Sequence, residues 1–354
     1  MLFGLYPKED RRELFGRDAE VEYVIRQVLS GNWVVIGGQR EIGKTSLMKV
    51  VINELKRDYG FRGIYINLRG VRGLDSLLNL IIAELNRSRV QLDLRISVNF
   101  MVGSAGIELR RNVKATNSLI ELLNSIQDNF VIGLDEVQEL SKASRQFLDV
   151  LGNVFSSNPR VRFIFSGSYI GVTKILINPS SSSPLHGRPP AVLNLKPFND
   201  ELSREFLRRG MEELGVEFNR VNEVVERLDG IVGWLTLFGN LYAVRRLGYE
   251  EALKLTLDEG RKIMMDEFKH FLENKSNKQL YLAIMDTVKV VNRWRDIKRG
   301  VEIRMGKVDD KELGLALEAL VNSNFIVKKE RGEYSIADPI LKEIDYSNIW
   351  AKGV

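Results

Sequence analysis

Residues 33–48 read WVVIGGQREIGKTSLM, and this stretch decides the fold, because an apolar strand runs into the pattern GxxxxGKT and then directly into a helical pattern. In such a loop, backbone N–H groups turn inward around a triphosphate, and Lys44 reaches the β and γ phosphates. The hydroxyl of Thr45 is placed to hold Mg²⁺. The helix that begins near Lys44 brings the positive end of its dipole to the same place. The residues predicted to contact the nucleotide are Gly38, Gln39, Arg40, Glu41, Ile42, Gly43, Lys44, Thr45 and Ser46.

The composition excludes several other chemistries. The 354 residues include no cysteine, which removes disulfides, thiolate metal sites and cysteine nucleophiles. The two histidines, His186 and His270, are far apart in sequence, which argues against a histidine metal centre or a Ser-His-Asp triad. Phosphate chemistry needs neither residue type. A hydrophobic content of 44% is ample for packed cores, and the length favours about two or three domains.

The sequence gives no sign of a signal peptide or a membrane span. The first residues, MLFGLYPKED, soon become charged, and no apolar run of about 18 residues follows. A cytoplasmic protein without a membrane span is therefore expected. The net charge of +5 and the isoelectric point near 9.2 suit an anionic partner, and ATP, nucleic acid and an acidic protein surface all fit.

A second signature lies at residues 130–140, FVIGLDEVQEL, where a wholly apolar strand ends in two adjacent carboxylates. The alternation of strands and helices around it predicts a parallel α/β sheet, in which ligands bind beyond the carboxyl ends of the strands. Asp135 is then expected to hold Mg²⁺ directly or through water, and Glu136 to polarise the water that attacks the γ phosphate. An ordinary strand terminus would look the same in isolation, but the phosphate loop upstream supplies the other half of one site.

Two further patterns lie in the same region. The strand predicted at residues 161–166 ends in the sequence SGS, so Ser166 or Ser168 could sense the γ phosphate by hydrogen bonding, although serine and glycine after a strand are also plain turn chemistry. Residues 90–111 alternate apolar and polar side chains around MVGSAG, which predicts an inserted β-hairpin. A solvated surface ribbon would have the same pattern, and no function follows from it.

Three shorter segments accompany the two signatures. They are FGRDAE at 15–20, PLHGR at 184–188, and Tyr334 followed by Asp338-Pro339. Together with the phosphate loop and the Asp-Glu strand, they resemble the archaeal ATPase family of the STAND class, which is related to AAA+ proteins. The resemblance covers nearly the whole chain. It implies an α/β fold with a P-loop parallel-sheet ATPase core at 1–196, an α-helical lid at 197–274 and a C-terminal winged helix at 275–354.

The resemblance also implies roles for residues outside the loop. Phe15 and Arg17 would lie near the adenine or the α phosphate. The alternative is that Phe15 is an ordinary core residue and Arg17 part of a charged helix start, which would give the same sequence pattern. Arg188 would act on the γ phosphate through its guanidinium, with an ordinary loop arginine as the alternative. Val232 stands where the family has a proline that touches the base, so Trp234 either takes over some base contact or lies in the core of the lid.

The C-terminal pattern is three helices followed by a hairpin, which is the order of a winged helix, commonly a DNA-binding module. The third helix, at 310–320, is acidic and lacks the Arg, Asn or Gln that base readout favours. The basic side chains lie before it and on the wing: Arg293, Arg295, Lys298, Arg299, Arg304, Lys328, Lys329 and Arg331. They could grip a DNA backbone, but a winged helix that packs against protein is slightly favoured.

The leading hypothesis is an ATP-hydrolysing switch, in which ATP/ADP and Mg²⁺ bind at the loop and hydrolysis moves the lid and the winged helix. Its expected catalytic residues are Lys44, Glu136 and Arg188, and the arginine could come from the same chain or from a neighbour in an oligomer. The alternative is a nucleotide-gated regulator that binds DNA or protein with little turnover. An origin-initiator-like ATPase shares the domain order but would need a more basic recognition helix.

Overall fold

The computed structural model describes residues 1–88, 115–167, 176, 181, 183–273, 275–329 and 332–346. The hairpin predicted at 90–111 lies outside these residues, as do Ser168 and Arg331. The chain divides into two compact units. The helical unit comprises Met1–Tyr6, Gln39–Ile42 and Lys196–Val354, and the sheet unit comprises Pro7–Gly38 and Gly43–Leu195.

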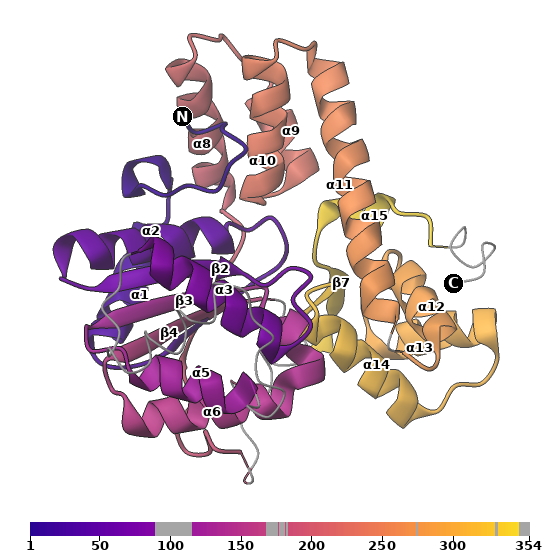
Figure 1. Cartoon of the computed structure of the whole chain (residues 1–354). Coiled ribbons are helices and arrows are strands. Elements are labelled where there is room, and N and C mark those ends of the chain that lie inside the picture. Colours follow the sequence, from indigo (N-terminus) through magenta and orange to yellow (C-terminus); the bar gives the residue numbers. More distant parts are fainter. Residues whose placement is uncertain are drawn as a thin grey trace. The chain divides into compact units, whose positions relative to one another are not determined.

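The sheet unit is built on a parallel sheet (Figure 1). Its strands are β1 (Val34–Gly37), β2 (Arg62–Asn67), β3 (Phe130–Asp135), β4 (Val161–Ser166) and β5 (Ala191–Asn194), in the spatial order β2-β3-β4-β1-β5. Every pairing in it is parallel, so the carboxyl ends of the strands meet at one edge. β1 and β3 are buried along their whole length, as expected for a parallel sheet that is covered on both faces. The predicted parallel α/β core is confirmed.

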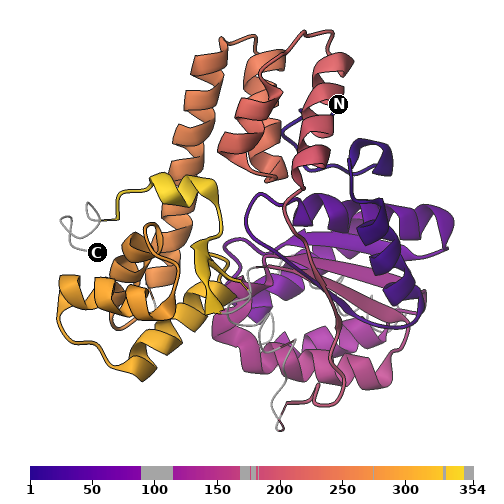
Figure 2. The same ribbon diagram turned by 180° about the vertical axis from the view of Figure 1, so that it is seen from behind.

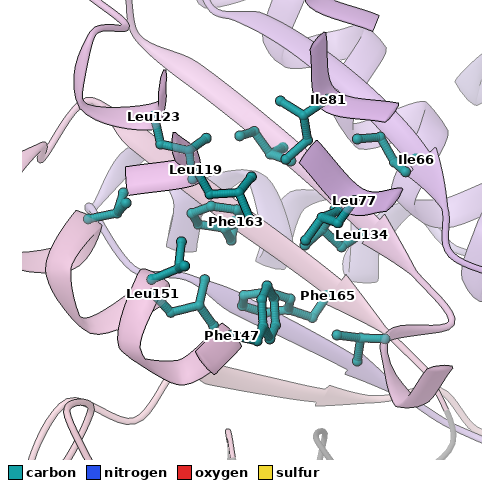
Figure 3. Close-up of a cluster of buried hydrophobic side chains, with 14 of the residues drawn as sticks. Ile66, Leu77, Ile81, Leu119, Leu123, Leu134, Phe147, Leu151, Phe163 and Phe165 are labelled. Atoms are coloured by element: carbon teal, nitrogen blue, oxygen red, sulfur yellow. The ribbon is translucent and has the colours of Figure 1, made fainter. Parts of the chain in front are cut away.

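One face of the sheet is covered by α3 (Leu74–Arg87), α5 (Ala115–Asn124) and α6 (Ser144–Ser157) (Figure 1). Each helix presents apolar side chains at helical spacing. Figure 3 shows the cluster that results: Leu77 and Ile81 from α3, Leu119 and Leu123 from α5, and Phe147 and Leu151 from α6, packed with Ile66, Leu134, Phe163 and Phe165 of the strands. This core holds β3 and β4 in place, and with them the residues at their carboxyl ends.

The other face carries α1 (Asp18–Leu29) and α2 (Lys44–Asp58), preceded by a short 3-10 helix, η1 (Arg11–Glu13). Two glycines let α2 lie close to the strands. A Cβ on Gly133 would come within 2.5 Å of the Ile52 side chain and 2.8 Å of the Met48 sulfur, both of α2, and one on Gly63 within 3.2 Å of Ile52 Cγ2 and 2.6 Å of Val131 Cγ1 on the neighbouring strand β3. Only glycine therefore fits at position 133 without movement of the helix, and at position 63 without movement of Val131.

The helical unit contains four helices that stand side by side (Figures 1 and 2). They are α8 (Asp200–Glu213), α9 (Val221–Leu228), α10 (Val232–Gly239) and α11 (Tyr249–Leu272), and a π-helical turn, η3 (Asn240–Val244), follows α10. The chain start packs among them, because the ring of Phe3 fills the space beside Gly210 and Gly239, and Asn240 Nδ2 donates a hydrogen bond to the Phe3 carbonyl at 2.9 Å. The expected helical segment is thus confirmed. Among the helices that the structure describes, none combines the length and apolar character needed to cross a membrane.

The last part of the helical unit is a winged helix. It consists of α12 (Lys278–Val288), α13 (Trp294–Met305), α14 (Asp310–Asn322) and an antiparallel hairpin of β6 (Ile326–Lys328) and β7 (Tyr334–Ile336). Ile326 and Ile336 face each other in this hairpin and are buried. Asp309 caps α14 by accepting hydrogen bonds from the backbone N–H groups of Lys311 and Glu312. The predicted C-terminal winged helix is confirmed.

A short final helix, α15 (Pro339–Glu343), fastens the winged helix to the four-helix part. It packs on α11 and α9, and Glu343 accepts a hydrogen bond from Arg227 of α9 at 3.0 Å. Asp338 caps α15 by accepting the Ile340 N–H at 2.8 Å, and it also accepts the indole N–H of Trp234 at 3.0 Å. Trp234 is 1% exposed. Of the two readings of this tryptophan, the position in the core of the helical segment is the one that the structure shows.

Candidate active site

The phosphate loop joins β1 to α2. Three of its residues have a left-handed backbone, with φ of 140° at Gly38, 58° at Glu41 and 96° at Gly43. Glycine takes such angles without strain, which accounts for the two glycines, whereas a glutamate needs surrounding contacts to hold it there. Lys44 begins α2, and its ammonium donates a hydrogen bond to the Gly38 carbonyl at 3.0 Å. The lysine therefore folds back over the start of the loop, where a phosphate ligand is expected.

Hydroxyl groups from three other elements donate hydrogen bonds to the carboxylate of Asp135. It lies at the end of β3 and is 2% exposed. Thr45 at the start of α2 donates to Oδ2 at 2.6 Å, and Tyr65 of β2 donates to the same oxygen at 2.8 Å. The hydroxyl of Ser166, at the end of β4, donates to Oδ1, which the Glu136 N–H also approaches at 3.1 Å. Thr45, Asp135 and Ser166, which were singled out from separate motifs, thus meet at one point.

Glu136 follows directly and turns away from the strand. Its backbone has φ of 58° and caps the 3-10 helix η2 (Val137–Ala143). One carboxylate oxygen accepts a hydrogen bond from Gln138 Nε2 at 2.5 Å, and the other lies 3.8 Å from Arg69 Nη2. The side chain is about a quarter exposed. A partly exposed carboxylate at the strand end, next to Asp135, has the chemistry of a base for water.

The other predicted contact residues lie around this centre. The Ser46 hydroxyl accepts the N–H of Lys8 at 3.1 Å, so the segment before α1 reaches the first turn of α2. Arg17 precedes α1, is buried, and pairs with Glu20 at 2.8 Å, whereas Phe15 is half-buried. These positions put the FGRDAE segment on the face of the sheet that α2 also covers.

Arg188 is not brought to this centre. Its Nη1 donates to Ser156 Oγ at 2.9 Å, and its guanidinium lies 5.2 Å from the centroid of the Phe155 ring. Phe155 in turn packs on Trp33, which precedes β1. Arg188 is therefore at the amino edge of the sheet, whereas the phosphate loop is at the carboxyl edge. The reason is topological: residues just before β5 must lie where a parallel strand begins. The predicted action of Arg188 on a nucleotide of its own chain finds no support here, and action on a neighbouring chain stays a prediction.

The tip of the phosphate loop, Gln39–Ile42, belongs to the helical unit and has contacts within it. The Glu41 carbonyl accepts the N–H of Gly233, at the start of α10, at 2.8 Å. A Cβ on Gly233 would lie within 2.6 Å of the Glu41 Cβ, so the two backbones touch. Arg40 forms an ion pair with Glu267 of α11 at 3.2 Å. Gln39 and Ile42 are buried. The left-handed backbone of Glu41 is thus held by α10.

Sequence reasoning missed Tyr65, Gln138 and the contact between Glu41 and Gly233. Tyr65 sits in an ordinary alternating strand, and its only signal is its position two residues before the carboxyl end of β2. Burial and the neighbouring Asp135 charge raise the pKa of the Tyr65 hydroxyl well above its usual value. The phenol is therefore a hydrogen-bond donor at every physiological pH.

Comparisons with known proteins agree with this geometry. A model of the ATPase domain found predominantly in Archaea matches residues 14–238, and a model of the C-terminal winged helix-turn-helix domain of MCM proteins matches residues 275–337. The chain belongs to the archaeal ATPase family that the first model defines. No curated protein matches the chain in sequence.

Solved structures extend the likeness over the whole chain. The Walker-type ATPase PABY2304 of Pyrococcus abyssi is similar at a TM-score of 0.78 and 26% identity, covering 97% of this chain and 99% of that one. The ORC2 protein of Aeropyrum pernix, solved as ADPNP–ADP complexes, has a TM-score of 0.63 and 16% identity, with coverage of 99% and 98%. Cdc6p from Pyrobaculum aerophilum has a TM-score of 0.50 and 14% identity, with coverage of 98% and 97%. The last two show the fold alone. The protein is a P-loop ATPase with a C-terminal winged helix, and its placement among AAA+ proteins and in the STAND class stays a prediction.

Proposed function

We propose that this chain is a Mg²⁺-dependent switch that hydrolyses ATP and passes its nucleotide state to the helical unit. The observation that carries the proposal is the hydrogen bond between Thr45 and Asp135 at 2.6 Å, at the end of the phosphate loop. In this proposal Lys44 binds the β and γ phosphates, Glu136 orients the attacking water, and Ser166 reports on the γ phosphate through Asp135. Phe15 and Arg17 contribute to the base end of the nucleotide.

The donor set suits Mg²⁺. This ion prefers oxygen ligands and keeps water and phosphate oxygens in its shell, so one hydroxyl and one carboxylate from the protein are enough. Thr45 and Asp135 supply that pair. When bound, the ion would neutralise charge on the β and γ phosphate oxygens. Within the described part of the chain, no group of three His, Cys, Asp or Glu side chains could hold a metal ion without a nucleotide.

The contacts of the loop tip connect the nucleotide site to α10 and to the winged helix. Glu41 bonds to Gly233 at the first turn of α10, and the next residue, Trp234, bonds to Asp338 at the start of α15. A ligand that reshapes residues 39–42 would therefore act on α10, and α10 on the winged helix. This chain of contacts supports a nucleotide-driven movement of the lid and of the winged helix. We propose the functional boundaries 1–196, 197–274 and 275–354 on the same basis.

The partner of the winged helix is proposed to be a protein rather than DNA. The exposed face of α14 carries Asp310 and Glu312, which would repel phosphates. Two of the basic side chains before α14 are engaged within the domain: Lys298 pairs with Asp310 and Glu302, and Arg304 donates to Thr287. Arg295 and Arg299 keep DNA as the second candidate, since they could contact a backbone. A binding assay over a salt series decides, because DNA contacts impose a steep salt dependence.

The hydrolysis step is tested with Glu136→Gln. This change keeps the size of the side chain and removes its basicity, so ATP should still bind while phosphate release falls by at least about a hundredfold. Glu139→Gln, in the short helix η2 that Glu136 precedes, is the matched control and should hydrolyse ATP like the natural chain. Unchanged phosphate release by Glu136→Gln would show that the base lies elsewhere.

A further inference from the structure

We propose that Tyr65 is a positioning residue for the metal site, and that its hydroxyl fixes the orientation of the Asp135 carboxylate. The inference rests on the proposed function of Asp135 as the metal-binding carboxylate. Tyr65 belongs to neither the phosphate loop nor the Asp-Glu strand. It acts from β2, a third element of the sheet.

The strand register puts Tyr65 in reach of Asp135. β2 and β3 are paired so that Tyr65 lies beside Gly133 and Asn67 lies beside Asp135. Residues two apart in a strand point to the same face, so Tyr65 and Asp135 are diagonal neighbours on the face that α2 covers. Gly133 has no side chain to fill the space between them. The phenol can therefore cross it, and its oxygen comes to 2.8 Å from Asp135 Oδ2.

The ring of Tyr65 is also held from the α2 side. Lys49 Nζ lies 4.8 Å from the ring centroid and pairs with Glu9 at 2.8 Å. Lys49 is one helical turn after Thr45, so the same helix supplies both a hydroxyl for Asp135 and a cation for the ring. A cation over an aromatic face is attracted by the negative face of the ring. The tyrosine ring is thus fixed independently of its hydroxyl.

The hydrogen bonds around Asp135 explain how the Tyr65 hydroxyl contributes to the orientation of the carboxylate. Ser166 and the Glu136 N–H donate to Oδ1, and Thr45 and Tyr65 donate to Oδ2. An ionised carboxylate has room for about four donors, so one of these four has to give way when Mg²⁺ or a water of its shell binds Asp135. The Thr45 hydroxyl retains lone pairs for a metal ion and must adjust when it binds one. Tyr65 has no such second task, and it keeps Oδ2 in place while Thr45 adjusts.

The test is Tyr65→Phe, which removes one oxygen and leaves the ring under Lys49. Calorimetry would measure ADP affinity in excess Mg²⁺ and again in EDTA, so the readout does not depend on turnover. Loss of an outer partner of a metal ligand weakens metal affinity by about 10–100-fold. The ratio of the two ADP affinities should therefore fall by about tenfold or more, with the EDTA value unchanged. Tyr23→Phe, which removes a half-buried hydroxyl of the same unit that contacts the Val192 carbonyl, should leave the ratio unchanged.

Two results would overturn the assignment. One is an unchanged ratio in Tyr65→Phe; the other is an equal loss of ADP affinity with and without Mg²⁺, which would indicate a general packing role. Asp135→Asn separates this inference from the proposed function. If Asp135→Asn abolishes the effect of Mg²⁺ and Tyr65→Phe does not change it, only the assignment of Tyr65 fails. If Asp135→Asn also leaves the effect of Mg²⁺ intact, the metal site itself is misplaced. Thermal unfolding of each variant verifies that it is folded.

Discussion

The indole N–H of Trp234 donates a hydrogen bond to the carboxylate of Asp338 at 3.0 Å, and both side chains are buried. The two residues are 104 positions apart. Trp234 lies in the first turn of α10 and Asp338 caps α15, so this buried bond helps to join the four-helix part of the helical unit to the end of the winged helix. Asp338 belongs to the YxxxDP pattern of the sequence, and this bond gives that pattern a structural task.

Trp234→Phe should reveal the strength of this connection. The change keeps an aromatic side chain and removes the donor, which leaves a buried carboxylate with one bond fewer. The expected loss of unfolding free energy near pH 7 is about 1.5–3 kcal/mol, the range for hydrogen bonds to charged groups, measured by denaturant titration. Trp33→Phe is the control, because that indole donates only to a neutral carbonyl, that of Val161, at 3.3 Å. A smaller loss in Trp234→Phe than in Trp33→Phe would contradict the prediction.

The same carboxylate should make stability depend on pH. Burial raises the pKa of Asp338 to about 6, and the charges of Asp229 and Glu267 add to the effect. An unfolded chain titrates aspartate near pH 3.9, so the folded state holds the proton more tightly. Its contribution is fully present below about pH 4 and is lost as the pH rises through about 6, which amounts to about 3 kcal/mol. Asp338→Asn should remove this part of the pH dependence. If the free energy of unfolding changed with pH in the same way in Asp338→Asn and in the natural chain, the prediction would be contradicted.

Gly233→Ala should disturb the phosphate loop from the helical unit. The added methyl group would lie within 2.6 Å of the Glu41 Cβ and 2.8 Å of its carbonyl oxygen, so the loop tip has to move. Overpacking of this kind costs about 1–3 kcal/mol, and ADP affinity should fall by about twofold to tenfold if half of that cost falls on the bound loop. Gly248→Ala is the matched control, since nothing lies within 4 Å of its added Cβ. If the two variants bound ADP with equal affinity, α10 would have no influence on nucleotide binding.

Arg188→Ala should leave hydrolysis by an isolated chain unchanged. The guanidinium lies against Phe155 and Ser156 at the amino edge of the sheet, so its removal affects packing and not the phosphates of its own chain. ATPase rates at low protein concentration should match those of the natural chain, with a loss of stability of about 1 kcal/mol. A rate that falls only at high concentration would assign Arg188 to a neighbouring chain. A fall at all concentrations, with ADP affinity unchanged, would contradict the prediction.

The sequence predicted those site residues that belong to short motifs, and it did not predict contacts between residues that are far apart in the chain. Thr45 and Asp135 were predicted because the phosphate loop and the apolar strand are defined by residues that are close in sequence, and the parallel sheet brings the two side chains to 2.6 Å. Tyr65 was missed because its task depends on a strand register and on the missing side chain of Gly133. Arg188 was assigned to the γ phosphate by resemblance, but a residue three positions before a parallel strand lies at the amino edge of the sheet, so only its action on a neighbouring chain stays a prediction. That topological argument was available from the sequence.

Gly133 has a consequence for how inactive variants should be interpreted. It sets the distance between α2 and the sheet, because its missing side chain leaves room for Ile52 and Met48. Thr45 belongs to that helix and Asp135 to the sheet, so a larger residue at position 133 would lengthen the distance between the two side chains, which is now 2.6 Å. A variant could therefore lose its response to Mg²⁺ through a change that touches neither the nucleotide nor the metal. For this ATPase, distance from the ligand is a poor guide to which substitutions are harmless.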